Sequence, residues 1–193
     1  MASPKILVIP GSLRSASYNV RLAALATKEL TLAEAEVTRI SLADYPLPIY
    51  DADTAKGGAP LNAFKLKQVL AAHRGIFIAS PEYNASLTPL LKNAIDWISV
   101  VREPGEVQLA VFQGRAFALG GASPGRSGAM QSLLALRQVL AVGCRALVIP
   151  EQVTVPNAEQ AFDEMDELKD SRAAGQLKTV VRKLIEYTRM FGG

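Results

Sequence analysis

The loop over residues 11–19 brings together side chains that bind phosphate groups in proteins. It holds one glycine, three serines, one arginine and one asparagine between a short apolar run and a segment with helical spacing. Its donors would therefore meet a helix N-terminus, where free backbone N–H groups and the helix dipole favour an anion. A single serine there would suit an ordinary helix cap. This density of donors favours a phosphate site.

The glycine spacing of the same loop narrows the kind of phosphate. A dinucleotide fingerprint needs G-x-G-x-x-G, and only Gly11 is present. The P-loop pattern G-x-x-x-x-G-K-[ST] is also missing. A monophosphate held by hydroxyl groups, such as the end of FMN, fits this loop better than a pyrophosphate.

Residues 81–86 form a second segment with the means to bind a ring. A proline, a glutamate, a tyrosine and an asparagine follow one another from Pro81 to Asn84. The aromatic side chain could form a wall for an isoalloxazine ring, and the polar groups could bond its pyrimidine edge. An ordinary turn that starts the next helix would also explain this segment.

A third segment, residues 120–128, is rich in glycine and contains the pattern G-x-S-x-G around Ser123. This pattern also marks the nucleophile of α/β-hydrolases, in which a histidine follows the serine along the chain. Here His73 is the single histidine, and it lies fifty residues before Ser123 at a predicted helix end, where it suits the helix dipole. Without a base the triad is excluded, and the segment is interpreted as a third wall of the same pocket.

The three segments follow strands of an alternating α/β pattern. Short apolar runs predict strands over 5–10, 37–42, 75–79, 116–119 and 146–149. Helical spacing predicts a helix that begins at residue 19, further helices over 61–72, 88–101 and 130–142, and a closing helical region over 158–190. Pro89 lies in the first turn of the helix over 88–101, where proline is tolerated. Residues 44–51 are predicted to form a loop. Such alternation is typical of a parallel sheet covered on both faces, with ligands at the carboxyl ends of the strands. With no repeat or linker, we expect one domain over 1–193.

Composition excludes several functions. The 193 residues carry 21 basic and 18 acidic side chains without a basic cluster, which argues against nucleic-acid binding. One histidine and one cysteine leave little for a transition-metal site, and Cys144 lies in an apolar stretch typical of a core cysteine. There is no stretch of 18 apolar residues and no secretory leader pattern, so a cytoplasmic protein without membrane partners is expected.

The three segments together resemble a known family. The motifs are Gly11-Ser12-Leu13-Arg14-x-x-Ser17-x-Asn19, then Pro81-Glu82-Tyr83-Asn84-x-Ser86 with residues 91–97, and the glycine-rich loop from Gly121. In this order and spacing they resemble the NADPH-dependent FMN reductases of the flavodoxin-like superfamily, which includes quinone, chromate and azo-dye reductases. The resemblance covers nearly the whole chain and implies a three-layer sandwich with a five-stranded parallel sheet in the order 2-1-3-4-5.

The resemblance also implies an FMN cofactor, NADPH or NADH as electron donor and a small-molecule acceptor. The implied cofactor-binding residues are Ser12, Arg14, Ser17, Tyr18 and Asn19 around the phosphate, Pro81, Glu82, Tyr83, Asn84 and Ser86 around the ring, and Ser123 and Gly125 on the other side. The chemistry is expected on the flavin, with no catalytic side chain, no metal and ping-pong kinetics.

Two further expectations concern the oligomeric state of the protein and the residue that recognises NADPH or an anionic acceptor. Members of the family are usually homodimers or homotetramers in which the helix bearing residues 93–97 contacts a partner, although Trp97 also suits a core position. An arginine could bind an anionic acceptor or the 2′-phosphate of NADPH; the candidates are Arg14, Arg102, Arg115 and Arg126. The rival hypotheses are a flavodoxin-type electron carrier, which is usually acidic, and a redox-inactive anion-binding module.

Overall fold

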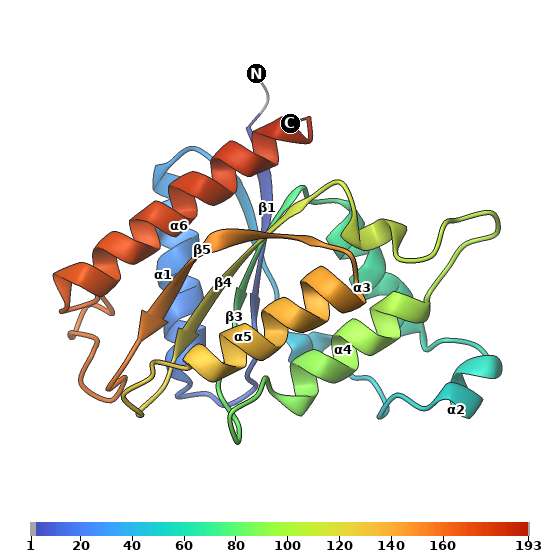
Figure 1. Ribbon diagram of the computed structural model, residues 1–193, viewed down its shortest axis with the longest axis horizontal. Helices are drawn as coiled ribbons and strands as arrows, with labels where there is room; N and C mark the ends of the chain where they lie inside the picture. Colours follow the sequence, from blue (N-terminus) through green and yellow to red (C-terminus); the bar gives the residue numbers. More distant parts are fainter. Residues whose placement is uncertain (1–2, 193) are drawn as a thin grey trace.

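A computed structural model describes residues 3–192 and contains one five-stranded parallel sheet (Figure 1). Its strands are β1 (Lys5–Pro10), β2 (Glu36–Arg39), β3 (Gly75–Ala79), β4 (Ala116–Ala122) and β5 (Leu147–Val155). The order is β2-β1-β3-β4-β5, as predicted. The central pair runs in register from Ile6 opposite Gly75 to Pro10 opposite Ala79.

Helices cover both faces of the sheet, which explains why the central strands are apolar at nearly every position. The helices are α1 (Tyr18–Leu32) and α6 (Ser171–Met190) on one face, α3 (Leu61–Ala71), α4 (Pro89–Val100) and α5 (Met130–Gln138) on the other, and the short α2 (Ala52–Lys56) at the side (Figure 1). Along β3 the side chains alternate between the two layers. Phe77 belongs to the core under α1 and α6, while Ile76 and Ile78 belong to the core under α3, α4 and α5.

Several boundaries differ from the sequence prediction. The second strand ends at Arg39 rather than residue 42, because Leu42 begins a 3₁₀ turn (Leu42–Asp44) that Ser41 caps. The helix predicted over 130–142 is α-helical only to Gln138 and continues as a π-helical turn (Val139–Gly143). The prediction of a closing helical region from residue 158 was wrong, because the helix begins at Ser171.

Residues 156–170 form a loop instead of the first part of that helix. Asn157 and Asp166 adopt left-handed backbone conformations, with φ of 48° and 63°, which a regular helix cannot include. Arg21 on α1 donates to Asp166 at 2.6 Å and stacks over the ring of Phe162. Backbone bonds within the loop, such as Asp163 N–H to Glu167 O at 2.9 Å and Lys169 N–H to Ala161 O at 3.0 Å, take the place of helical hydrogen bonds.

The loops after β1, β3 and β4 meet at the carboxyl edge of the sheet, the lower edge in Figure 1. Backbone bonds continue beyond the strand ends: Gly11 N–H donates to Ala79 O at 2.8 Å, and Ser80 N–H donates to Gly120 O at 2.8 Å. The bases of the three loops are therefore fixed relative to one another. No helix between residues 3 and 192 has the length and apolar character needed to cross a membrane.

Candidate functional site

A pocket of about 210 Å³ lies where the three loops meet. Its lining residues are Ser12, Arg14, Ser17, Tyr18, Asn19, Pro81, Glu82, Tyr83, Ala122, Ser123 and Pro124. Most of the predicted cofactor-binding residues are therefore brought together, although they come from three segments far apart in the sequence.

Three predicted residues lie outside this lining, and two lining residues were missed. Asn84, Ser86 and Gly125 do not line the pocket, whereas Ala122 and Pro124 do. The sequence pattern ended the fourth strand at residue 119, but β4 continues through Ala122 and carries its backbone to the pocket edge. The run of small residues 120–122 hid this extension, because it lacks the large apolar side chains on which strand prediction depends.

The loop after β1 presents its free donors at the start of α1. Ser17 is the N-cap of α1, and its Oγ accepts a bond from Asn19 N–H at 3.3 Å. The Oγ of Ser12 accepts from Arg14 N–H at 3.2 Å. Both hydroxyl protons remain available to a ligand. The first turn of α1 contains no acidic residue, so nothing there offsets the positive end of the helix dipole.

Arg14 supplies the positive charge of the pocket. It is exposed, and its guanidinium carbon lies 5.6 Å from the centre of the Tyr18 ring. Within residues 3–192 its guanidinium makes one hydrogen bond, to Ala16 O, which is long at 3.4 Å. Most of its N–H groups can therefore bind an anion.

Asn19 performs a structural task that the sequence did not reveal. Its side chain is buried, its Nδ2 donates to Ala122 O at 2.8 Å, and its Oδ1 accepts from Ala122 N–H at 2.9 Å. The amide thus joins the start of α1 to the end of β4. One N–H of the amide is left for a ligand.

The carboxylate of Glu82 is held at the N-terminus of α5. Its Oε2 accepts from the backbone N–H groups of Gln131 at 3.0 Å and Ser132 at 3.3 Å. The side-chain amide of Gln131, oriented with its nitrogen toward Glu82, also donates to both carboxylate oxygens. The helix N-terminus compensates the charge of Glu82, which would otherwise oppose an anion in the same pocket.

Two buried hydroxyl groups fix the backbone of the same loop. The Oγ atoms of Ser80 and Ser132 lie 2.7 Å apart, and Ser132 also donates to Pro81 O at 2.8 Å. Both side chains are fully buried. The loop after β3 is thereby fastened to α5 as well as to β3.

The tip of this loop is a tight two-residue turn. Tyr83 and Ser86 exchange backbone bonds of 3.0 and 3.1 Å, and Asn84 and Ala85 between them have φ of 50° and 60°. Positive φ at both central residues is the pattern of a type I′ turn, for which asparagine is well suited and alanine is not. The turn holds the Tyr83 ring outward with 53% of the residue exposed, a flat surface beside the pocket.

The loop after β4 closes the pocket and is not a nucleophile elbow. Ser123 Oγ accepts from Gly125 N–H at 3.2 Å. A Cβ at Gly121 would lie 2.8 Å from Ala129 Cβ, so the backbone there must be glycine. His73 lies at the opposite edge of the sheet, where its Nδ1 is 2.7 Å from Val69 O and its neighbour Arg74 bonds the start of β1. His73 and Ser123 therefore lie at opposite edges of the sheet, an arrangement that does not form a hydrolase triad.

Arg115 is removed from the candidates for binding anions at this site. It precedes β4 at the amino edge of the sheet, only 4% of it is exposed, and its Nε donates to His73 O at 3.1 Å. Burial lowers the pKa of its guanidinium to about 10. Arg102 and Arg126 are exposed and do not line the pocket, which leaves Arg14.

Two further sequence expectations concern buried groups. Trp97 is fully buried and donates to Pro48 O at 2.8 Å, so it is a core residue within this chain. Cys144 is also buried, and burial raises the pKa of its thiol to about 11, as expected of a core cysteine. Residues 3–192 contain no group of three or more histidine, cysteine or acidic side chains arranged to hold a metal ion.

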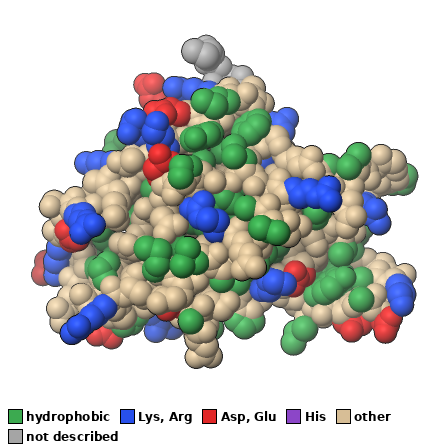
Figure 2. Space-filling view, in the orientation of Figure 1, with side chains coloured by type: hydrophobic (Ala, Val, Ile, Leu, Met, Phe, Trp, Pro, Cys, Tyr) green, Lys and Arg blue, Asp and Glu red, His purple; other side chains and the backbone are tan. Residues whose placement is uncertain are grey.

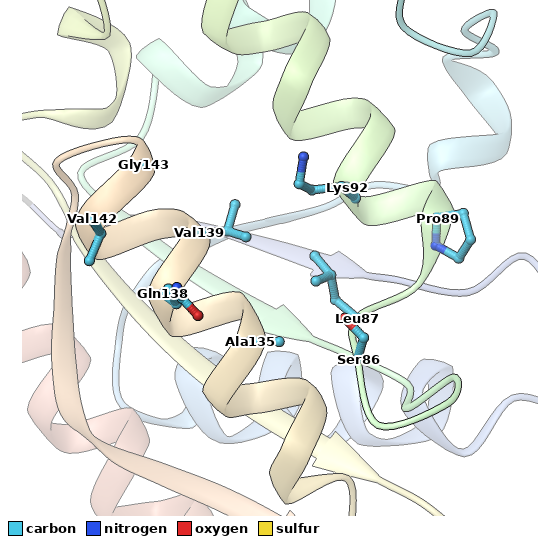
Figure 3. Close-up of a pocket in the computed structure, with 9 residues that line it drawn as sticks. All are labelled: Ser86, Leu87, Pro89, Lys92, Ala135, Gln138, Val139, Val142 and Gly143. Carbon is cyan, nitrogen blue, oxygen red and sulfur yellow. The ribbon is translucent and has the colours of Figure 1, made fainter.

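Ser86 lines a different cavity, an apolar groove of about 650 Å³ between α4 and α5 (Figure 3). Leu87, Pro89 and Lys92 form one side of this α4–α5 groove, and Ala135, Val139 and Val142 lie on the other. Val142 and the neighbouring Leu134 are 75% and 56% exposed.

The donors of the pocket fit a phosphate monoester with an attached ring. Two serine hydroxyl groups, one guanidinium and a helix N-terminus face it from one side, while Tyr83 and the backbone of residues 81–83 border it from the other. Glu82 carries the single carboxylate of the lining, and its charge is already balanced by the backbone N–H groups at the start of α5. On the face drawn in Figure 2, basic side chains are scattered and form no continuous patch of the kind that a nucleic acid would require.

Comparisons with known proteins agree with this geometry. A family model described as NADPH-dependent FMN reductase matches residues 4–160. The chain is 35% identical over 191 residues to an NAD(P)H-dependent FMN reductase of Pseudomonas aeruginosa, covering 98% of this chain and 97% of the relative. It is 31% identical over 186 residues to a 2-hydroxy-1,4-benzoquinone reductase of a Burkholderia species, covering 96% of each.

Among solved structures, the flavoenzyme NAD(P)H:(acceptor) oxidoreductase FerB of Paracoccus denitrificans is similar over 98% of this chain and 100% of that chain. The TM-score is 0.77 and the sequence identity 26%.

Proposed function

This chain belongs to the NADPH-dependent FMN reductase family, and from that premise we propose that it transfers electrons from NADPH or NADH to small quinones. It is an NAD(P)H-dependent oxidoreductase with FMN as its cofactor. The observation that carries the proposal is the pocket itself, in which a positive charge, free hydroxyl groups and a helix N-terminus lie beside a rigid loop with an exposed aromatic ring.

Bound FMN would supply the redox chemistry, since it accepts a hydride from a reduced nicotinamide and returns two electrons to an acceptor. In our proposal Ser12, Arg14 and Ser17 bind its phosphate. A charge-assisted bond from Arg14 gives this contact most of its strength. Asn19 holds the end of β4 against this loop.

The ring side of the cofactor would be bordered by Pro81, Glu82 and Tyr83. The backbone N–H and C=O of Glu82 would bond the ring edge, because Pro81 O and the backbone of Tyr83 are already bonded within the protein. Ser132 and the N-terminus of α5 hold this loop in place. Ser123 faces the pocket from the opposite wall. Asn84, Ser86 and Gly125 would act by shaping the turns around these residues.

We further propose that donor and acceptor use the same open site in turn, which gives ping-pong kinetics. No side chain of the pocket is required as a general acid or base. Quinones are the favoured acceptors, because a relative of similar length is named as a benzoquinone reductase. Free flavins, azo compounds and chromate are further candidate acceptors of the same site.

We propose that a second copy of this chain occupies the α4–α5 groove, giving a homodimer or homotetramer in the cytoplasm. The support is the apolar lining of the groove, which includes Val139 and the exposed Val142. Light scattering would test it: Val142→Glu would produce monomers if the groove is the interface. An unchanged molar mass would place the contact elsewhere.

The proposed function is tested by adding FMN to protein freed of flavin and then following NADPH oxidation with 1,4-benzoquinone. Arg14→Ala should weaken FMN binding by roughly 10- to 100-fold, the value of one hydrogen bond from a charged group. Arg126→Ala, an exposed arginine outside the pocket, is the matched control. Absence of FMN binding and of NADPH oxidation in the unmodified protein would overturn the proposal.

A further inference from the structure

A second cavity lies beside the FMN pocket at the same edge of the sheet. It has a volume of about 330 Å³ and is formed by three segments: Leu13 in the loop after β1, residues 42–47 after β2, and the first turns of α4. We call it the Leu13 cavity.

One short stretch of backbone separates the Leu13 cavity from the FMN pocket. Ser12 and Arg14 line the pocket, and Leu13 between them lines the cavity. Leu13 is 54% exposed although it lies in a loop of otherwise polar residues. The two spaces therefore share a wall one residue thick, polar on one side and apolar on the other.

The walls of the Leu13 cavity carry no charged side chain. Leu13, Leu42, Leu47 and Leu90 provide most of the surface. Asn93 is present, but its Oδ1 accepts from Tyr50 N–H at 2.7 Å and its Nδ2 donates to Pro48 O at 2.9 Å. The cavity thus offers an anion no positive charge, which argues against chromate, ferric chelates or a nucleotide phosphate as its ligand.

The outer wall is rigid before any ligand binds. Pro46 in this wall and Pro48, which follows the lining residue Leu47, restrict the backbone. Their carbonyl groups accept bonds of 2.9 Å from Asn62 and 2.8 Å from Trp97. Small-molecule sites are typically preformed apolar hollows of this kind, and a volume near 300 Å³ lies at the lower end of their range. It suits a ring or a short alkyl chain and is too small for a dinucleotide.

We propose that the Leu13 cavity binds the apolar substituent of a quinone acceptor while the reducible ring of that quinone faces the flavin held in the neighbouring pocket. The inference rests on the proposed quinone reductase function and refines it. The enzyme would therefore favour quinones that carry an uncharged, apolar substituent. Anionic acceptors would gain no affinity from the cavity.

The first test measures kcat/KM for 1,4-benzoquinones with an unbranched alkyl substituent of increasing length. Each methylene that enters the cavity should raise kcat/KM by roughly fourfold until the cavity is full, as expected for burying one methylene. Quinones with a carboxylate or sulfonate on the chain should show no gain. Equal gains for charged and uncharged chains would overturn the proposal.

A variant that fills the cavity is the second test. Ala43 lines the cavity and is exposed, so Ala43→Phe should be tolerated by the fold and should abolish the gain with chain length. Ala52→Phe, another exposed alanine that does not line the cavity, is the matched control and should keep the gain. A gain that survives Ala43→Phe places the substituent elsewhere.

Binding can also be measured without turnover, because Trp97 is the single tryptophan of the chain and donates to Pro48 O, one residue beyond the lining residue Leu47. Quinones quench tryptophan fluorescence, so titration of FMN-free protein with the same quinones should give dissociation constants that fall with chain length, less so in Ala43→Phe. Equal constants for short and long chains would overturn the inference. If no acceptor, ferricyanide included, supports NADPH oxidation, the proposed function fails. The titration would still show whether the Leu13 cavity binds the quinone substituent.

Discussion

The side-chain amide of Asn19 is hydrogen bonded on both sides to the backbone of Ala122, 103 residues further along the chain. The pair of bonds joins the loop that follows β1 to the loop that follows β4. Because Asn19 is only 3% exposed, neither Ala122 group can turn to water if the amide is removed.

Asn19→Ala should therefore lower the free energy of unfolding by about 2 kcal/mol, since it leaves a buried N–H and a buried C=O without partners. FMN affinity should fall as well, because the two walls of the pocket are no longer held together. Urea unfolding and FMN titration measure the two effects. Asn62→Ala, which removes one bond at an exposed side chain, is the control and should cost much less. Equal losses for both variants would contradict a special role for Asn19.

Glu82→Gln tests the contact between the loop after β3 and α5. The variant keeps an acceptor for Gln131 and Ser132 but loses the charge at the helix N-terminus, an effect of about 0.3–1 kcal/mol on stability. Thermal unfolding measures this loss. Glu164→Gln, at an exposed position in the loop before α6, should leave the melting temperature unchanged. A melting temperature unaltered by Glu82→Gln would contradict the charged cap.

Ala85→Gly should stabilise the protein. Ala85 has φ of 60°, a conformation that costs an alanine about 1–2 kcal/mol and a glycine almost nothing. The greater flexibility of glycine in the unfolded chain removes about 0.5–1 kcal/mol of that gain, so a net increase near 0.5–1 kcal/mol is expected by urea unfolding. Ala33→Gly is the control, because Ala33 lies at an exposed helix end with φ of −90° and carries no backbone strain for glycine to remove. This variant should be neutral or destabilising.

The thiol of Cys144 should resist modification and should make stability depend on alkaline pH. Burial raises its pKa from an ordinary value of 9.0 to about 11, so near pH 10 the unfolded chain has lost the proton that the folded chain keeps. The unfolded state then binds fewer protons, and the thiol's contribution to stability falls as the pH rises from about 9 towards 11. Comparison with Cys144→Ala isolates this slope, and a thiol reagent at pH 8 should label only unfolded protein.

The first and third strands and the chemistry of the loops could be predicted from the sequence because both depend on local patterns. Residues 5–10 and 75–79 alternate with helical segments, and the donors around Ser17 cluster within one short loop. Long-range partners could not be predicted in this way. Nothing near Glu82 in the sequence indicates that its carboxylate caps a helix that begins at Met130.

The wrong helix prediction before Ser171 has a different origin. The segment has acidic and apolar residues with near-helical spacing, but Asp163 Oδ1 accepts from the backbone N–H groups of Met165 and Glu167, both at 2.9 Å. Such local bonds from a side chain to the backbone compete with helix formation.

Helix α5 joins two functional regions through its two ends. Its first backbone N–H groups hold Glu82, and the turn after its last residue contributes Val139 and Val142 to the α4–α5 groove. Any molecule that binds in the groove and shifts this helix would also shift the loop that borders the cofactor pocket. Thermodynamic reciprocity then requires that occupation of the groove and binding of FMN change each other's affinity by the same factor.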